Sequence, residues 1–153
     1  MQKKRQEVAV SAADLVKIPE GGVTEAGVRT NISVGIQYLE AWLRGKGSVP
    51  LNSLMEDAAT AEICRAQLWQ WIRNGTKLSD GRTMSLEIFK TITDEELERI
   101  KGQIGGESQS RQFELSRELF SRMVSAKDFP EFLTLPAYEE LLRLEKTAYP
   151  PRI

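Results

Sequence analysis

The chain has 153 residues, of which 41% are hydrophobic, and this size and composition suit a single folded domain. Its 21 basic and 22 acidic residues give a net charge of −1, so it lacks the basic excess of a nucleic-acid-binding protein. The absence of histidine excludes Ser-His and Cys-His nucleophile chemistry and histidine metal sites. The single cysteine, Cys64, excludes an internal disulfide and suits a reducing compartment.

Residues 1–22 are predicted to be a linker that leads into the domain. Within them, Ser11 and Asp14 have the spacing of a capping box, which predicts one helical turn before Pro19 breaks the chain. The basic start at 1–5 lacks the apolar segment of a signal peptide, and no apolar run approaches the roughly 20 residues that span a membrane. The C-terminal residues are not a peroxisomal address, so we expect a cytoplasmic protein without membrane contact.

A first long helix is predicted from Thr24 to Arg44. Its apolar residues recur at helical spacing on one wide face, which favours a central, largely buried position in the fold. Gly45 and Gly47 are expected to end it. The stripe consists of Ile32, Ile36, Leu39 and Leu43.

Residues 48–53 are interpreted as a short apolar connector, too short to form a sheet of its own. A second helix is predicted to follow the acidic pair Glu56 and Asp57 and to end at Asn74-Gly75, a C-capping pattern. Ala61, Cys64, Leu68 and Ile72 would lie along one face of this helix.

The second half of the chain shows further helical patterns. Thr83 is predicted to cap a short helix, and Thr93 with Glu96 forms a capping box that predicts another. Ser108 or Ser110 would open the next helix, and Pro136 suits the first turn of the last. The fold class is therefore predicted to be all-α, a compact bundle of about five or six helices over residues 23–146, with 147–153 as a tail.

The acidic pair has two interpretations from its residues alone. An aspartate at a helix start caps free backbone N–H groups and complements the helix dipole. However, Leu54 and Met55 surround the carboxylates with apolar surface, and the small residues of the next turn would let another molecule approach closely.

The chain resembles the C-terminal domain of malate synthases. The resemblance is carried by residues 23–32, 34–39 and 54–63, the last of which begins Leu-Met-Glu-Asp, and it continues through 69–72. Residues 132–138 resemble the end of the same family's chains. A similarity of this length is more specific than a short motif.

The resemblance implies an activity that this chain alone cannot supply. Malate synthases use a (β/α)8 barrel, closed by this helical domain, to condense acetyl-CoA with glyoxylate and water to malate and CoA in the glyoxylate cycle. A chain of 153 residues with this pattern cannot also contain a barrel. The family's Mg²⁺ ligands lie on the barrel, so no metal ligand is expected here, and the isolated chain is expected to be inactive.

Asp57 matches the family's general base, which removes a proton from the acetyl methyl group. Such a base must contact a weak carbon acid in a mostly dry site. Met55 matches a residue that lies near the acetyl group, although from the sequence alone a role as a flexible core residue is equally plausible. Glu56 is interpreted as a structural partner of an arginine.

Other polar and aromatic residues have ordinary structural interpretations. Arg29 and Arg65 can bind phosphate, but pairing with carboxylates is commoner. Cys64 has the pattern of a small buried residue, and Trp69 and Trp71 are more often core or interface anchors than cofactor stackers. Two hypotheses remain: the catalytic closing domain of malate synthase, whose partners are the barrel, acetyl-CoA and glyoxylate, or a free-standing helical interaction module without activity.

Overall fold

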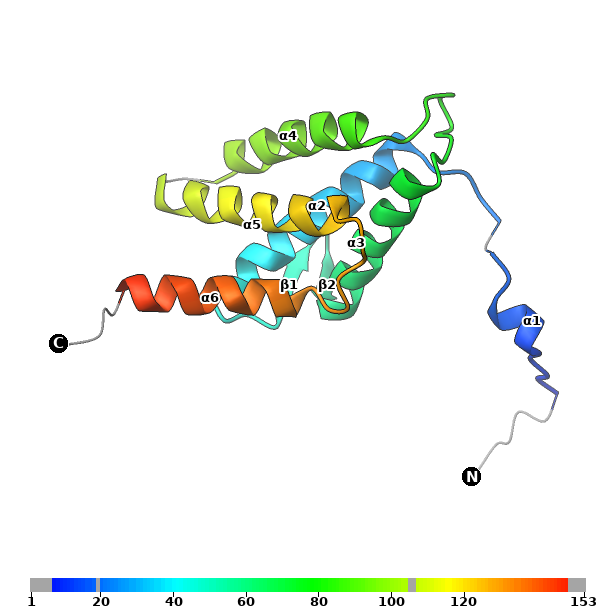
Figure 1. Ribbon diagram of the computed structural model, residues 1–153, viewed down its shortest axis with the longest axis horizontal. Coiled ribbons are helices and arrows are strands. Elements are labelled where there is room, and N and C mark those ends of the chain that lie inside the picture. Colours follow the sequence, from blue (N-terminus) through cyan, green and yellow to red (C-terminus); the bar gives the residue numbers. More distant parts are fainter. Residues whose placement is uncertain (1–6, 19, 105–106, 149–153) are drawn as a thin grey trace.

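The computed structural model describes residues 7–18, 20–104 and 107–148. Within these residues it contains six helices and one two-stranded sheet (Figure 1). The elements are α1 (Ala12–Leu15), α2 (Glu25–Leu43), β1 (Ser48–Leu51), β2 (Leu54–Asp57), α3 (Ala58–Arg73), α4 (Leu86–Gly102), α5 (Glu107–Ser125) and α6 (Thr134–Ala148). The prediction of a mostly helical bundle with about five or six helices is confirmed.

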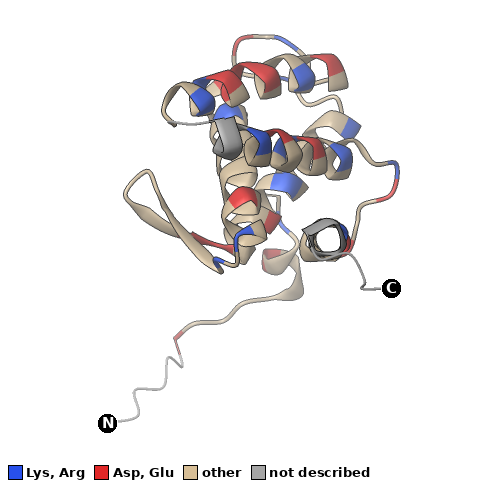
Figure 2. Cartoon of the chain, turned by 90° about the vertical axis from the view of Figure 1, so that its left-hand side faces the viewer, with Lys and Arg blue, Asp and Glu red and all other residues tan. Residues whose placement is uncertain are grey.

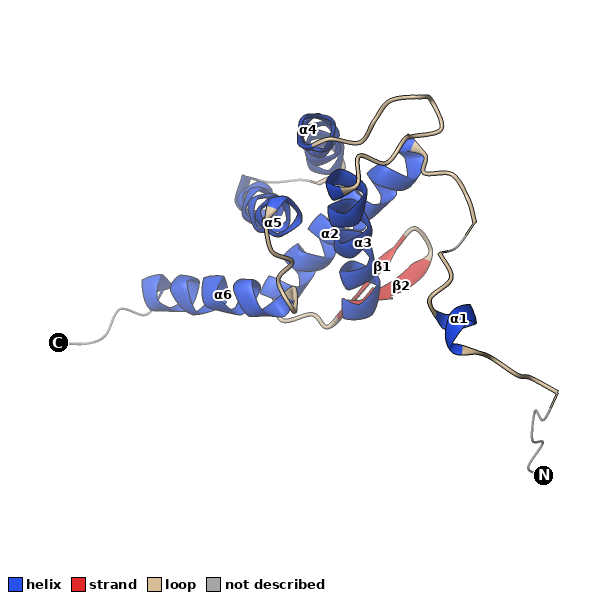
Figure 3. Cartoon of the chain, turned by 45° about the vertical axis from the view of Figure 1, so that its right-hand side comes forward, coloured by secondary structure: helices blue, strands red, loops and turns tan. Residues whose placement is uncertain are grey.

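Helix α2 is the central element, as its wide apolar stripe predicts. The Thr24 hydroxyl accepts a hydrogen bond from the Gly27 N–H and caps the start of the helix. The helix ends at Leu43, and Gly45 follows with a φ of 82°, a conformation that favours glycine. Helices α3, α4, α5 and α6 all contact α2, and Figure 3 shows α2 and α3 between the end-on α4 and α5 and the hairpin.

The apolar core forms where these helices face α2. Its members share near-complete burial and come from every helix except α1. They include Val28, Ile32, Ile36 and Leu39 of α2, Leu68 of α3, Phe89, Ile92, Leu97 and Ile100 of α4, Phe113, Leu119, Phe120 and Met123 of α5, and Ala137 of α6.

One helix occupies the region where the sequence predicted two. Ser85, not Thr83, caps α4, with its hydroxyl accepting from the Ile88 N–H at 3.3 Å. The helix then continues through Thr93, whose predicted capping role is wrong because its side chain is buried inside α4. The apolar residues before and after Thr93 lie on one continuous helical face, and burying that face against α2 and α5 favours an unbroken helix.

The expectation that 48–53 is an unpaired connector is also wrong. Strands β1 and β2 form an antiparallel hairpin in which Ser48 is opposite Asp57 and Leu51 is opposite Leu54. The two residues between the strands, Asn52 and Ser53, both have positive φ, at 51° and 64°. Two such residues are typical of the two-residue hairpin turns whose twist matches that of the strands.

The chain ends differ in how they relate to this bundle. Ser11 and Asp14 form the predicted capping box of α1, which buries no residue and lies apart from the other helices (Figure 1). Helix α5 begins at Glu107, and Pro136 lies in the first turn of α6 as predicted. Gly105-Gly106, a glycine pair whose sequence predicts a helix break, and most of the predicted tail lie outside the described residues. The proposed boundaries of the linker, domain and tail remain predictions.

Candidate functional site

The hairpin presents an apolar surface at one end of the molecule. Leu54 and Met55 follow the turn at the start of β2 and are 62% and 67% exposed. Leu51, across the ladder from Leu54, is half-buried. Figure 2 shows the hairpin projecting from the helices without charged residues until the acidic end of β2. The core-residue interpretation of Met55 is therefore wrong, because its side chain lies in solvent.

Asp57 ends β2 and begins α3, so a single residue fixes the angle between strand and helix. Its extended backbone (φ −124°, ψ −173°) is that of an N-cap, and its Oδ1 accepts a hydrogen bond from the Thr60 N–H at 3.1 Å. The carboxylate is exposed, and within the described part of the chain Oδ2 has no hydrogen-bond partner. One oxygen is thus held by the helix N-terminus, while the other has no partner among the described residues.

Glu56 and Asp57 have opposite environments because strand side chains alternate between faces. Glu56 is buried, at 9% exposure, whereas Asp57 is exposed. The expected ion pair between Glu56 and an arginine is wrong, since no described basic residue pairs with it. Two adjacent carboxylates therefore do not share one site.

The single thiol lies under this junction. Burial raises the pKa of Cys64 to about 11, and the negative charge of Glu56 adds to the shift. A neutral, 4% exposed thiol is not a nucleophile at physiological pH, which confirms the structural interpretation of Cys64.

Tyr38 connects the hairpin base to α2. Its buried hydroxyl donates to the Gly47 carbonyl oxygen at 3.2 Å, just before β1. Burial raises the pKa of Tyr38, and the charges of Asp57 and Glu62 raise it further. No sequence pattern indicated this bond, because it joins residues whose approach depends on how the hairpin folds back on α2.

The two arginines of the matching helices pair with carboxylates, as expected. Arg29 binds Glu25, Glu95 and Glu96, and these hydrogen bonds raise the pKa of Arg29. The guanidinium of Arg65 is buried, with Glu62 as its ion-pair partner.

Arg65 also anchors the loop before α6. It stacks on the Phe129 ring, 4.1 Å from the centroid, and donates to the Glu131 carbonyl oxygen at 3.1 Å. Trp69 contacts the same ring and donates to the Ala126 carbonyl oxygen at 2.9 Å. Arg65 and Trp69 are thus structural anchors that hold the α5–α6 connection against α3.

No helix in the described part of the chain is long and apolar enough to cross a membrane. Within the same residues, no three acidic or cysteine side chains cluster closely enough to hold a metal ion.

Comparisons with known proteins identify this arrangement. The family description "Malate synthase, C-terminal" matches residues 22–141, which include the hairpin, Asp57 and the helices packed around α2. The chain belongs to the malate synthase family. The matched part of the family is its C-terminal domain.

Individual relatives agree with this assignment. The malate synthase of Myxococcus xanthus is 49% identical over 142 residues, covering 92% of this chain and 26% of that protein. The glyoxysomal malate synthase of Brassica napus is 44% identical over 144 residues, with the same two coverages. A bifunctional glyoxylate cycle protein of Caenorhabditis elegans is 48% identical over 129 residues, covering 84% of this chain and 13% of that protein. This malate synthase domain therefore spans about a quarter of the length of the malate synthases it matches.

Proposed function

We propose that this domain serves a full-length malate synthase, in which Asp57 is the general base that removes a proton from the methyl group of acetyl-CoA. The resulting carbanion would attack the aldehyde carbon of glyoxylate, and hydrolysis of the thioester would release malate and CoA. The observation that supports this role is that the two oxygens of the Asp57 carboxylate differ. Oδ1 accepts a hydrogen bond from the Thr60 N–H, and Oδ2 is unpartnered among the described residues.

The cap makes Asp57 a well-positioned base. The hydrogen bond to Thr60 restricts the side chain, and its attachment to the rigid start of α3 fixes where Oδ2 lies. The positive end of the helix dipole favours the negative charge that a base needs. Because Asp57 is exposed and Oδ2 has no partner among the described residues, a methyl group can reach it without displacing a hydrogen bond within this part of the chain.

A second domain would complete the site. Asp57, Leu54 and Met55 are exposed in this chain, whereas abstraction of a proton from a weak carbon acid needs a mostly dry environment. We propose that the (β/α)8 barrel of the full-length protein covers this end of the hairpin and that Met55 lies near the acetyl group. Mg²⁺ would be held by barrel residues, and no step assigned to this chain uses it.

The decisive experiment replaces Asp57 by asparagine in the full-length protein that bears this domain. Asparagine has nearly the same shape and still caps a helix, so the melting temperature should stay almost constant. The loss of a general base should lower kcat by about 10² to 10⁴, or roughly 3 to 5 kcal/mol. Deuterium exchange from solvent into the acetyl methyl group should fall in parallel, because this partial reaction isolates proton abstraction.

Asp128→Asn is the matched control, since Asp128 is an exposed aspartate on the α5–α6 connection. It should change neither turnover nor exchange. If Asp57→Asn retains near-normal turnover, Asp57 is only a helix cap and the proposed role is wrong. If turnover falls while methyl exchange persists, Asp57 acts after proton abstraction.

The partner assignment has a separate test. The 153-residue chain and a separately produced barrel would be mixed with acetyl-CoA, glyoxylate and Mg²⁺, and CoA release would be followed. We expect neither part to release CoA by itself. Activity of the isolated chain would contradict the proposal that the barrel is required.

A further inference from the structure

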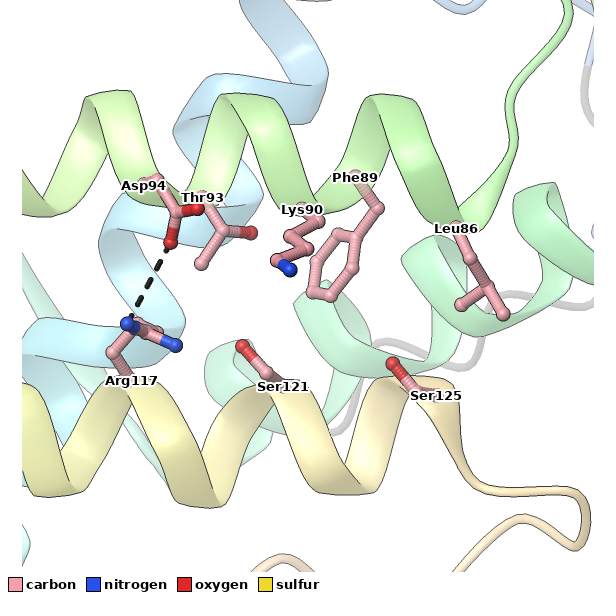
Figure 4. A pocket seen from close by; sticks show the side chains of 8 residues that line it. All are labelled: Leu86, Phe89, Lys90, Thr93, Asp94, Arg117, Ser121 and Ser125. Atoms are coloured by element: carbon pink, nitrogen blue, oxygen red, sulfur yellow. Dashed lines mark ion pairs between the residues drawn. The ribbon is translucent and has the colours of Figure 1, made fainter.

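Helices α4 and α5 leave a hollow between them. The α4–α5 cavity, of about 260 Å³, is lined by one stripe from each helix. Helix α4 contributes Leu86, Phe89, Lys90, Thr93 and Asp94, and helix α5 contributes Arg117, Ser121 and Ser125. The α5 side chains recur every fourth residue, and at two of the three positions a small serine faces α4 in place of a residue that would fill the space (Figure 4).

The cavity contains a buried hydroxyl without a partner. Thr93 is 1% exposed, and its Oγ1 forms no hydrogen bond with any described residue. A threonine in a helix can satisfy its hydroxyl with the carbonyl oxygen four residues earlier, as Thr30 and Thr91 do in this structure. Thr93 instead projects toward α5 with its hydroxyl unpaired (Figure 4). A buried polar atom without a partner is destabilising, so it calls for an explanation.

Arg117 has unused donors in the same place. Its Nε is buried and unpartnered, and its ion pairs with Asp94 and Glu114 are 3.6 Å and 3.7 Å long, beyond ordinary hydrogen-bond distance. The Lys90 side chain points between the helices (Figure 4). Among the described residues, Lys90, Ser121 and Ser125 have no side-chain hydrogen bond either. The buried Thr93 hydroxyl and the buried Nε of Arg117 therefore lie unpartnered at one cavity, whereas the exposed Lys90 and Ser125 are accessible to water.

The charged and apolar side chains that line the cavity indicate which kind of ligand would bind the unpartnered groups. Among the residues that line the cavity, Lys90 and Arg117 carry two positive charges and Asp94 carries one negative charge, while Glu114 lies outside the lining and pairs with both Arg117 and Lys101. A guanidinium binds carboxylates through two parallel hydrogen bonds, and the Asp94 carboxylate disfavours a doubly charged anion. Phe89 and Leu86 supply an apolar wall.

We propose that the α4–α5 cavity binds a small organic monocarboxylate, with Arg117, Lys90 and Thr93 holding the carboxylate and Phe89 contacting its carbon chain. The cavity volume of about 260 Å³ lies just below the roughly 300–1,000 Å³ of pockets that hold drug-sized ligands, so this cavity suits a smaller carboxylate. This site is independent of the proposed role of Asp57, because α4 and α5 carry neither the hairpin nor the start of α3.

The test is a titration of the ¹⁵N-labelled 153-residue chain with sodium butyrate and sodium benzoate, followed by NMR at constant ionic strength. We expect saturable shifts that cluster at residues 86–94 and 117–125, with a Kd on the order of 1 mM. Butan-1-ol, which has the carbon chain without the charge, should bind at least about tenfold more weakly. Inorganic phosphate, which carries more charge and no carbon chain, should also bind more weakly.

Two variants and one control test the residues. Arg117→Gln should weaken butyrate binding about tenfold or more, and Thr93→Val should weaken it less while preserving the fold, because it only removes an unpartnered hydroxyl. Arg122→Gln, an exposed change on the same helix, should have no effect. The dispersion of each spectrum reports whether the variant is folded, and calorimetric titration of the full-length protein repeats the measurement in its native context.

Four outcomes would overturn the proposal. Absence of saturable shifts up to about 50 mM ligand would mean that the cavity holds only water. Equal binding of butan-1-ol would make it an apolar cavity without anion recognition. Preferential binding of phosphate, or unchanged butyrate affinity in Arg117→Gln, would mean that the carboxylate is not what Arg117 recognises.

Discussion

Asp57 occupies a position where stability and the proposed chemistry make different demands on one side chain. As a cap it needs only one oxygen acceptor for the Thr60 N–H, and serine or asparagine could supply that. As a base it needs a carboxylate whose second oxygen is free. Different substitutions of Asp57 should therefore affect stability and turnover differently. Asp57→Ala should lower the free energy of unfolding by about 1 kcal/mol, whereas Asp57→Asn should lower it little.

Cys64 should make the domain less stable in alkaline solution. The ordinary thiol pKa of 9.0 applies to the unfolded chain, while burial raises it to about 11 in the folded state. The stability from a neutral buried thiol is thus fully present below pH 9 and is lost as pH rises toward 11, by up to about 1.4 kcal/mol per pH unit. Urea unfolding of Cys64→Ala between pH 8 and 11 should show a shallower decline.

This test depends on how steeply the free energy of unfolding falls with pH in the two proteins, and not on its absolute value in either. Truncating the buried side chain also lowers stability at every pH, so the neutral-pH loss is not diagnostic. Tyr38, whose pKa is also raised by burial, contributes an alkaline decline in both proteins. Parallel declines in the wild-type and Cys64→Ala proteins would show that the thiol does not ionise differently on unfolding.

At the scale of elements, the hairpin turn retains backbone strain that a single change should remove. Ser53 has a φ of 64°, in the left-handed region that costs a non-glycine residue about 1–2 kcal/mol. Ser53→Gly would give the Asn-Gly pair favoured in such turns. We expect it to raise the free energy of unfolding by roughly 0.5–1 kcal/mol, as measured by urea denaturation.

A serine-to-glycine change at Ser48, elsewhere in the hairpin, is the control. Ser48 lies in β1, where glycine has no conformational advantage and adds entropy to the unfolded chain. Ser48→Gly should lower stability by about 0.5–1 kcal/mol. If both changes destabilise equally, the turn at Asn52 and Ser53 is not strained in solution.

The helix ends that depend on local chemistry were predictable from the sequence, whereas the hairpin was not. Thr24 caps α2, and Asn74-Gly75 follows α3, because a side-chain oxygen or a glycine acts over three or four residues. The strands of the hairpin have only four residues each, and β1 contains Pro50, so no alternation was long enough to indicate pairing. The Asn52-Ser53 turn was the available signal.

Other errors arose where tertiary packing outweighs a local motif. Thr93 and Glu96 have the spacing of a capping box, yet both are buried within α4. Asp57 could be recognised as a cap from its place before a helical pattern, but the burial of Glu56 depends on the strand that the sequence did not reveal. The proposed role of Asp57 as a general base came from the family resemblance and not from residue spacing.

At the scale of the whole molecule, close contact between α2 and α5 depends on one glycine. A Cβ atom at Gly35 would lie closer than 3.0 Å to three ring carbons of Phe120. Gly35→Ala should gain about 0.5–1 kcal/mol of helix propensity but cost about 1–3 kcal/mol through overpacking, so the net change should be destabilising. Thermal unfolding followed by circular dichroism would measure it.

Gly102→Ala is the matched control, because a Cβ at that helical position meets no atom within 4 Å. Its stability should be unchanged or slightly raised. A double variant, Gly35→Ala with Phe120→Leu, should recover part of the loss if the ring is the obstacle. Loss of stability in Gly102→Ala as large as in Gly35→Ala would contradict the packing explanation.

The exposed hairpin should make the isolated chain self-associate. The apolar side chains of Leu54 and Met55 would be covered by the barrel in the proposed full-length enzyme, and uncovered patches of this kind promote association. We expect concentration-dependent light scattering and binding of a hydrophobic dye, both reduced in a Leu54→Gln, Met55→Gln double variant. Leu15→Gln, which changes a residue of α1 that is even more exposed, should have a smaller effect.

A strict monomer at high concentration that does not bind the dye would remove the support for docking at the hairpin. Reduction of scattering by Leu15→Gln alone would place the self-association surface on the N-terminal segment instead.

The central position of α2 also affects the chain while it is being synthesised. Helix α2 is translated before α3, α4, α5 and α6, all of which pack against it. At about 5–20 residues per second, the roughly 80 residues between the end of α2 and the end of α5 take on the order of 4 to 16 s to emerge. Helices α3 and α4 emerge during that interval, so the apolar face of α2 is covered in steps and stays incompletely covered until α5 has emerged.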